Sequence, residues 1–298
     1  MPNLALLILR RNDTHGISRL QEYDGTNTFR THAHPRNRPA TSQAFRFLAT
    51  QTPSHMNETA EWACPAERPV VSTDVIHVWR ASLEIEPATL QRLKSTLAKN
   101  ELERAQRFIF DQDRNRFIAA RGILREVLAR YLQCAPQTIE FVYGARGKPA
   151  ISGGGSRDPL RFNLSHSHDL ALIGLARERE IGIDLEMIRP DFASEEIAKR
   201  YFSAKEIEEL SRLPADLRTE GFFLCWTRKE AYIKAKGEGL HIPLDSFDVS
   251  LTPGLSLKLN SSDCSRWSMF SLAPKSGYVA AVVEEGSGSQ LRQFNWDP

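Results

Sequence analysis

Two acidic side chains, Asp184 and Glu186, stand two positions apart in the segment Ile181-Gly-Ile-Asp-Leu-Glu186. On a β-strand this spacing directs both carboxylates to one face, while Ile183 and Leu185 point to the other. Two neighbouring negative charges repel each other unless a cation lies between them, and oxygen-only ligands favour magnesium or manganese over zinc. The spacing is common, however, and by itself it favours a solvated strand face near a sheet edge.

A third carboxylate lies in Trp226-Thr-Arg-Lys-Glu-Ala-Tyr-Ile-Lys234, where Trp226, Glu230 and Lys234 recur every four residues. On a helix these side chains share one face, so a carboxylate and an ammonium group lie beside an aromatic ring. The pattern supports two interpretations equally: a functional stripe, or an i, i+4 ion pair worth roughly 0.3 kcal/mol beside a core tryptophan.

The segment Phe162-Asn-Leu-Ser-His-Ser167 predicts a strand that runs into a turn, with a hydroxyl and an imidazole adjacent. Ser165 and His166 can both bind phosphate oxygens. A serine nucleophile with a histidine base is the competing interpretation. It is disfavoured, because the chain lacks a Gly-x-Ser-x-Gly motif and neighbours on a strand point to opposite faces.

Two further segments have simple structural explanations. Tyr143-Gly-Ala-Arg-Gly-Lys-Pro149 predicts a tight turn that holds Lys148 before a proline, where a cation suits either a phosphate or solvent. Ser203-Ala-Lys-Glu206 matches the capping box of a helix N-terminus, which accounts for Glu206 without any catalytic role.

Two successive blocks of helices followed by strands would position these groups. The first block has a strand at 74–83, a helical stripe of Leu90, Leu93 and Leu97, a segment capped by Asn100, a long helix at 114–132, and strands at 139–143, 161–165, 170–176 and 181–186. The second has helices at 194–201, 203–213 and 219–236, then strands near 247–251, 256–259, 267–272 and 278–283. The repeated plan predicts an α+β protein of two similar halves.

Residues 1–69 are expected to form a poorly ordered extension, because most of this segment is rich in Thr, His, Asn, Arg, Pro and Ser and shows no sustained periodicity. An alternative is that the biological start is Met56. We therefore divide the chain into the extension at 1–69, a first half at 70–178, and a second half at 179–298 that carries the acidic groups.

The composition argues against several classes of protein. The chain has 298 residues and a net charge of only +2, so no global attraction to nucleic acid is expected. Its four cysteines lie far apart, which argues against a disulfide-rich secreted scaffold and fits a reducing cytoplasm. No stretch approaches the roughly 18 apolar residues that a membrane-spanning helix requires.

Taken together and in this order, five segments resemble the signature of the Sfp-type 4'-phosphopantetheinyl transferases, over roughly residues 75–283. They are Gly147-Lys-Pro149, Phe162-Asn-Leu-Ser-His-Ser167, Gly182-Ile-Asp-Leu-Glu186, Phe202-Ser-Ala-Lys-Glu206, and Trp226-Thr-Arg-Lys-Glu-Ala231 with Lys234. The resemblance implies two similar α+β halves related by a pseudo-twofold, with coenzyme A in the cleft between them. It also implies that the 4'-phosphopantetheine group of coenzyme A is transferred to a serine of an apo acyl or peptidyl carrier protein. Transfer would depend on Mg2+, or on Mn2+, and would release adenosine 3',5'-bisphosphate.

The resemblance assigns catalytic and metal-binding roles to matching positions. Asp184, Glu186 and Glu230 would hold the metal, and Glu230 would also deprotonate the acceptor serine. Glu206 matches a further acidic position near the metal. Lys234 would contact the pyrophosphate and support the leaving group.

Other matching positions would bind the donor substrate. Ser165 and His166 would contact the phosphates of coenzyme A, and Lys148, Arg104 and Arg121 would contact its nucleotide end. Because the carriers of this family are usually acidic, the arginine-rich stretch at 104–125 offers a complementary docking patch.

The resemblance further implies a monomer, and it leaves open which fatty-acid, polyketide or peptide-synthetase carrier is served. Two rival hypotheses use the same residues. One is a non-catalytic module that binds coenzyme A or a carrier protein, and the other is a metal-dependent phosphohydrolase.

Overall fold

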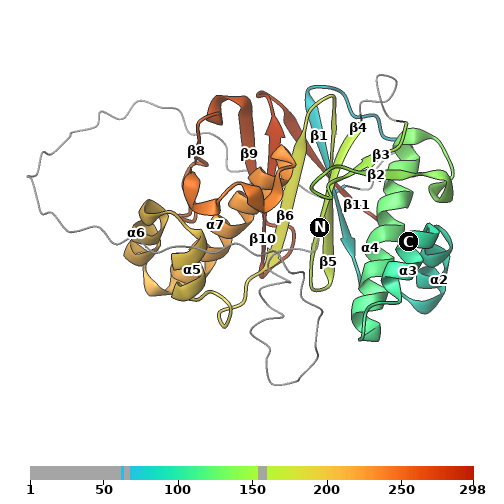
Figure 1. Ribbon diagram of the computed structural model, residues 1–298, viewed down its shortest axis with the longest axis horizontal. Coiled ribbons are helices and arrows are strands. Elements are labelled where there is room, and N and C mark those ends of the chain that lie inside the picture. Colours follow the sequence, from blue (N-terminus) through green and yellow to red (C-terminus); the bar gives the residue numbers. More distant parts are fainter. Residues whose placement is uncertain (1–61, 64–67, 154–159) are drawn as a thin grey trace, which may run out of the picture. The chain divides into compact units, whose positions relative to one another are not determined.

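A computed structural model describes residues 62–63, 68–153 and 160–298 (Figure 1). The predicted extension at 1–69 lies almost wholly outside the described residues, and so does Met56. All the described residues belong to a single structural unit.

The described residues of the first half form four helices, one of them a 3-10 helix, and five strands. They are β1 (Val75–Ser82), α2 (Pro87–Ser95), α3 (Lys99–Ala105), α4 (Asp111–Leu132), the 3-10 helix η1 (Pro136–Thr138), β2 (Phe141–Tyr143), β3 (Pro149–Ile151), β4 (Leu160–Ser167) and β5 (Leu170–Arg177). The first strand and the long helix predicted from the sequence are both present.

The second half begins with a strand and continues with three α-helices. Its elements are β6 (Ile181–Met187), α5 (Glu195–Tyr201), α6 (Ala204–Arg212), α7 (Ala215–Lys236), the 3-10 helices η2 (Gly239–His241) and η3 (Leu244–Ser246), β7 (Asp248–Val249), β8 (Leu259–Asn260), η4 (Cys264–Arg266), β9 (Trp267–Leu272), β10 (Tyr278–Glu285) and β11 (Gln290–Asn295). Gly237 ends α7 in the left-handed conformation, with a φ of 71°, as a glycine after a helix commonly does.

The same arrangement of elements occurs twice. The strands of the first sheet lie in the order β11-β1-β5-β4 and those of the second in the order β6-β10-β9. In the first half β1 pairs with β5, and β5 pairs with β4. In the second half β6 pairs with β10, and β10 pairs with β9 in the same way. Each half also has a helix of 22 residues, α4 or α7, and a small hairpin, β2–β3 or β7–β8. The predicted duplication is therefore confirmed.

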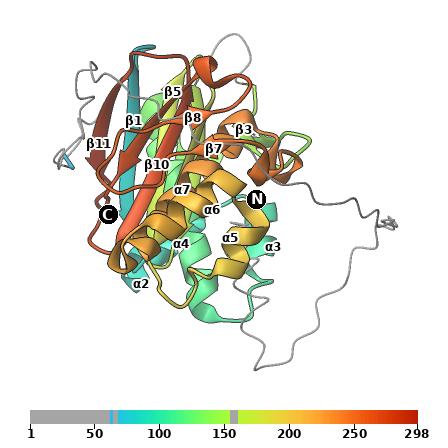
Figure 2. The ribbon, with the colours of Figure 1, turned by 90° about the vertical axis from the view of Figure 1, so that its left-hand side faces the viewer.

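The two sheets pack against each other through one apolar cluster. It includes the fully buried Ile76 and Leu172 of the first sheet and Ile183 and Val282 of the second. The other face of the first sheet packs on α4, and Trp79 is part of that second cluster. Helix α7 packs on β6 and β10 (Figure 2). The long helices thus lie outside and the sheets inside.

Three details differ from the sequence analysis. Asn100 lies inside α3, whose first turn is capped instead by Glu101, since the backbone N–H of Ala98 donates to that carboxylate at 3.0 Å. Strands β3 and β11 were not expected. The first has only three residues and starts with a proline, and the second depends on parallel pairing with β1 at the far end of the chain.

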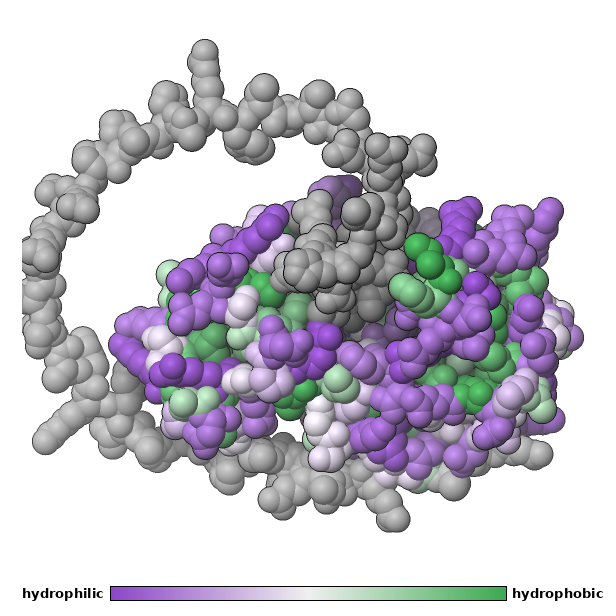
Figure 3. Space-filling model, turned by 90° about the horizontal axis from the view of Figure 1, so that it is seen from below, coloured by the Kyte–Doolittle hydropathy of each residue, from purple (hydrophilic) through white to green (hydrophobic). Residues whose placement is uncertain are grey.

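The face of the molecule in Figure 3 is largely hydrophilic, with scattered hydrophobic residues. Large apolar side chains that are exposed include Ile109 and Phe110, which precede α4. In the described part of the chain, no helix combines the length and the apolar character needed to cross a membrane.

Candidate active site

The two halves meet where β4 and β6, each an edge strand of its sheet, lie side by side. Here the backbone N–H groups of β6 donate to side-chain oxygens of β4 rather than to its backbone carbonyls. Asn163 Oδ1 accepts the N–H of Ile183 at 2.9 Å, and Ser165 Oγ accepts that of Leu185 at 3.3 Å. Ser167 Oγ accepts the N–H of Met187 at 3.2 Å. We refer to these three hydrogen bonds as the β4–β6 junction.

The carboxylates of Asp184 and Glu186 lie at this junction. As predicted, they point away from Ile183 and Leu185, which belong to the apolar cluster between the sheets. The Ser165 hydroxyl donates to Asp184 Oδ1 at 3.0 Å, and the Ser167 hydroxyl donates to Glu186 Oε2 at 2.9 Å. Asp184 is 0% exposed and Glu186 is 4% exposed, so the alternative of a solvated strand face is wrong.

Helix α7 approaches β6 closely because Gly182 has no side chain. A Cβ atom at this position would lie 2.1 Å from the carbonyl oxygen of Ala231 and 2.3 Å from the nitrogen of Ala235. The close contact brings the Glu230 and Lys234 face of α7 to the strand. Lys234 Nζ donates to Asp184 Oδ1 and, at 3.3 Å, to the hydroxyl of Ser165.

The electrostatics of this group follow from its burial. Burial raises the pKa of Glu230 to about 7, and Lys234 opposes this while the charge of Asp184 adds to it. Burial also raises the pKa of Asp184, against the influence of Lys234. For Lys234, burial would lower the pKa, but Asp184 and Glu230 together outweigh burial and raise it. The charges of Asp184, Glu230 and Lys234 therefore depend on one another in a buried region.

The residues present fit a divalent cation by their chemistry. Asp184 Oδ2 and Glu230 Oε1 are buried and have no hydrogen-bond partner among the described residues. Buried oxygens without a partner are rare, a bound ion is one way to satisfy them, and carboxylate oxygens are what Mg2+ and Mn2+ prefer. As the side chains lie, however, no three His, Cys, Asp or Glu residues in the described ranges form a ready metal-binding group.

His166 lies half-buried beside this group, on the strand between the two serines. Its pKa is lowered to about 4, first by burial and then by the positive charges of Lys234, Arg104 and Arg116. A neutral imidazole among cations is a suitable neighbour for a bound anion. Arg104 is exposed, stacks on Phe117 at 5.2 Å, and has no carboxylate at ion-pair distance in the described residues.

Two of the predicted nucleotide contacts are already bound within the protein. Lys148 Nζ donates to Glu180 Oε2 at 2.7 Å and to the carbonyl oxygens of Ile181 and Ala235 at 3.1 Å each, which uses all three of its protons. Arg121 is buried and donates to Glu101 Oε1 at 2.7 Å through Nε. The structure thus places both cations in internal ion pairs.

Glu206 also makes internal contacts. The predicted capping box is confirmed, since Ser203 N donates to Glu206 Oε2 at 2.8 Å and Glu206 N donates to Ser203 Oγ at 3.2 Å. The buried Lys229 lies 2.8 Å from Oε2, and Val249 N donates to Oε1 at 2.7 Å. Both oxygens of Glu206 are therefore bonded, which is typical of a structural carboxylate.

Sequence reasoning gave Asn163 and Ser167 no role. The signal that would have identified them is the Asn-x-Ser-x-Ser alternation, because polar side chains on one face of a buried strand need partners.

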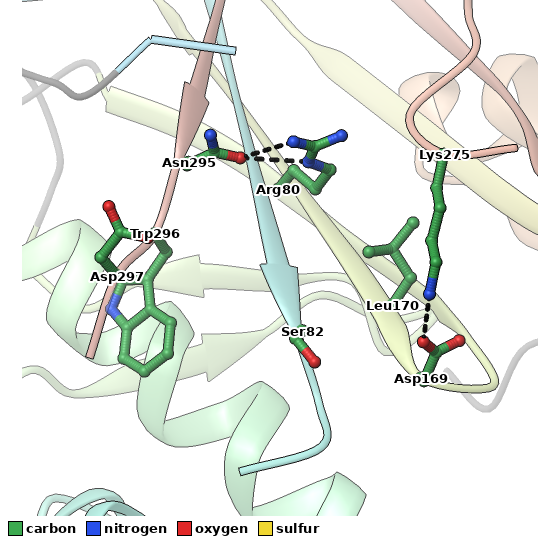
Figure 4. A pocket seen from close by; sticks show the side chains of 8 residues that line it. All are labelled: Arg80, Ser82, Asp169, Leu170, Lys275, Asn295, Trp296 and Asp297. Carbon is green, nitrogen blue, oxygen red and sulfur yellow. Dashed lines mark hydrogen bonds and ion pairs between the residues drawn. The ribbon is translucent and has the colours of Figure 1, made fainter.

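A separate cavity of about 350 Å³ lies at the ends of β1 and β11 (Figure 4). Its cations have partners, since Lys275 Nζ lies 2.6 Å from Asp169 and Arg80 donates to Asn295. None of the predicted site residues lines this cavity. Its lining residues are Arg80, Ser82, Asp169, Leu170, Lys275, Asn295, Trp296 and Asp297.

Comparison with known proteins identifies the family of this two-half α+β chain. Residues 79–178 match the family described as 4'-phosphopantetheinyl transferase, N-terminal, and residues 180–283 match the 4'-phosphopantetheinyl transferase superfamily. The chain belongs to this superfamily. It transfers the 4'-phosphopantetheine group from coenzyme A to carrier proteins.

Individual relatives are similar over much of their length. The chain is 43% identical to the 4'-phosphopantetheinyl transferase HetI of Nostoc sp. over 224 residues, which is 75% of this chain and 93% of HetI. It is 35% identical to the transferase Sfp of Bacillus subtilis over 161 residues, or 54% of this chain and 69% of Sfp. Among solved structures, a holo-(acyl-carrier-protein) synthase from Bacillus anthracis in complex with CoA aligns at 22% identity and a TM-score of 0.32, over 36% of this chain and 96% of the other.

Proposed function

We propose that the transfer reaction takes place at the β4–β6 junction and that Asp184, Glu186 and Glu230 hold one divalent cation there, Mg2+ or Mn2+. The observation that carries this proposal is the pair of buried, unpartnered oxygens, Asp184 Oδ2 and Glu230 Oε1. The bound cation would neutralise negative charge on the pyrophosphate of coenzyme A.

Glu230 is the proposed general base. Its carboxylate accepts the proton of the acceptor serine as the serine oxygen bonds to the β-phosphorus. The phosphoanhydride bond breaks at the same phosphorus, and adenosine 3',5'-bisphosphate leaves with the electron pair. A carboxylate whose pKa is raised to about 7 by burial accepts a proton more readily than an exposed glutamate does.

Lys234 is proposed to stabilise the leaving phosphate. Its ammonium group already lies among the acidic groups, hydrogen-bonded to Asp184 and Ser165. A positive charge fixed in a buried site stabilises developing negative charge more strongly than a solvated one. Lys234 lies two helical turns after the fully buried Trp226 on the same face of α7.

The phosphates of coenzyme A are proposed to bind near His166, and the exposed Arg104 is a proposed contact for the nucleotide end. The cationic surroundings of His166 support this. Ser165 can also donate to a phosphate. Its single hydroxyl hydrogen now donates to Asp184, so the hydroxyl would have to rotate toward the phosphate. Lys148 and Arg121 remain proposed contacts for the nucleotide end, and each would have to exchange an internal partner for the ligand.

The carrier is proposed to be an acyl or peptidyl carrier protein that docks through acidic residues. The arginine-rich stretch at 104–125 offers a smaller surface than its sequence suggests, because Arg121 and Arg125 are buried against Glu101. The exposed Arg107 is left for docking, and the apolar Ile109 and Phe110 follow it.

A panel of apo carrier proteins tests the proposal. Each would be incubated with coenzyme A, with and without Mg2+, and its intact mass measured. At least one carrier should gain one phosphopantetheine group on a serine, only in the presence of the cation. If the wild type and Glu230→Ala modify that carrier equally fast, or if removal of all divalent cations has no effect, the proposed site is wrong.

A further inference from the structure

Ser167 makes two hydrogen bonds that together fix the direction of its hydroxyl. Its oxygen accepts the backbone N–H of Met187 at 3.2 Å, and its proton goes to Glu186 Oε2 at 2.9 Å. The side chain is buried, at 7% exposure, so water does not readily replace either partner. A hydroxyl held by a backbone group in this way can orient the carboxylate that it contacts.

We propose that Ser167 is a positioning residue for Glu186, which sets the direction in which this carboxylate presents its oxygens to the cation. The inference rests on the proposed metal site. Partners that orient a metal ligand typically contribute 10- to 100-fold to metal affinity, as the hydrogen bonds around other metal sites do.

The register of the two strands supports this role. Ser165 and Ser167 are two residues apart on β4, and each donates to a carboxylate on β6, Asp184 or Glu186, which are also two apart. Each serine also accepts the N–H of the residue after its carboxylate. The period of two along both strands therefore gives each acidic side chain a hydroxyl of its own.

Ser165 is a poor subject for a test, because Lys234 also donates to its oxygen and a change there would alter several proposed roles at once. Ser167 has no such additional role. Asn163 provides a matched control, since its side chain accepts the N–H of Ile183 at 2.9 Å in the same junction and, among the described residues, has no hydrogen bond to a proposed metal ligand.

Binding of Mn2+ to the full-length protein, followed by electron paramagnetic resonance of the free ion, is the measurement. Ser167→Ala should weaken Mn2+ binding about 10-fold, and Ser167→Thr, which keeps the hydroxyl, should bind like the wild type. Asn163→Ala should also bind like the wild type, although it loses a junction hydrogen bond. Circular dichroism would verify that all variants are folded, and the Mg2+ concentration for half-maximal transfer should rise only for Ser167→Ala.

Two results would overturn the proposal. If Ser167→Ala and Asn163→Ala weaken Mn2+ binding equally, the junction acts only by joining the halves. If Ser167→Ala binds Mn2+ as the wild type does, the hydroxyl orients nothing that matters to the cation. A wild type that binds no Mn2+ would instead reject the metal site itself, and the positioning role with it.

Discussion

Glu230 is the residue whose chemistry depends most on its surroundings. Its side chain is 3% exposed. The nearby Asp184 disfavours a negative charge on Glu230, and the nearby Lys234 favours one. Its pKa of about 7 in the folded protein exceeds the 4.5 of an ordinary glutamate, so its contribution to stability is present below about pH 4.5 and is lost as the pH rises through 7. Without a cation, ionised Glu230 destabilises the fold.

The variant Glu230→Gln separates stability from function. We expect the transfer rate to fall by about 10²- to 10⁴-fold, since a general base is removed. At about pH 8 and without metal, the variant should nevertheless unfold at a higher urea concentration than the wild type, because no buried charge remains at this position. Rates from mass spectrometry and urea titrations measure both. A variant that is less stable than the wild type would contradict the account.

His77 provides a pH prediction outside the site. His77 Nδ1 lies 2.7 Å from the hydroxyl oxygen of Tyr131, which also accepts the indole N–H of Trp79 at 2.8 Å. Burial lowers the pKa of His77 to about 4, from 6.5 in the unfolded chain. The stability that this gives is present above pH 6.5 and is lost as the pH falls towards 4.

Between these two pH values, the free energy of unfolding of the wild type should therefore fall by up to about 3 kcal/mol more than that of His77→Gln. Urea unfolding at a series of pH values measures the difference. Parallel curves for the two proteins would show that His77 does not titrate with folding.

At the scale of elements, Gly182 determines how closely α7 approaches β6. Replacing it with alanine would put a methyl group 2.1 Å from a backbone oxygen of the helix, so α7 has to move. We expect Gly182→Ala to lose roughly 3 kcal/mol of stability and most of its transfer activity, because Glu230 and Lys234 move away from Asp184.

Gly122→Ala is the matched control for Gly182→Ala. A methyl group at Gly122 would lie 2.6 Å from Leu93 Cβ, at a helix contact in the other half. This variant should be destabilised too, but its folded fraction should keep wild-type activity. Unfolding curves and rates per folded molecule distinguish the two, and equal loss of specific activity would show that Gly182 has no particular effect on the site.

Local sequence patterns predicted which side chains share a face of β6 or of α7. They did not predict contacts between residues far apart in the sequence. Alternation placed Asp184 and Glu186 on one face, and the four-residue period placed Glu230 and Lys234 on another, as the structure confirms. The internal partners of Lys148 and Arg121 could not be predicted, because Glu180 and Glu101 approach them only through folding. The same holds for the β4–β6 junction, which joins strands of two different sheets.

At the scale of the whole molecule, the last strand links the two halves. β11 follows the second repeat along the chain but pairs in parallel with β1 of the first sheet, and Trp296 after it is buried in the core of the first half. The halves are therefore connected at β4–β6 and again through the C-terminal strand.

Removing residues 290–298 should unfold both halves rather than only the second, since β1 loses a neighbour and the first core loses Trp296. Differential scanning calorimetry of the full-length and shortened proteins measures this. A shortened protein that still shows one cooperative transition near the wild-type temperature, with full activity, would show that β11 is dispensable.

The central claim is that three carboxylates from one strand and one helix bind a single cation. A crystal soaked with Mn2+ and coenzyme A tests it through the anomalous difference map. We expect one manganese peak within about 2.2 Å of an oxygen from each of Asp184, Glu186 and Glu230, beside the pyrophosphate. A peak elsewhere, or one that leaves Glu230 outside the coordination sphere, would contradict it.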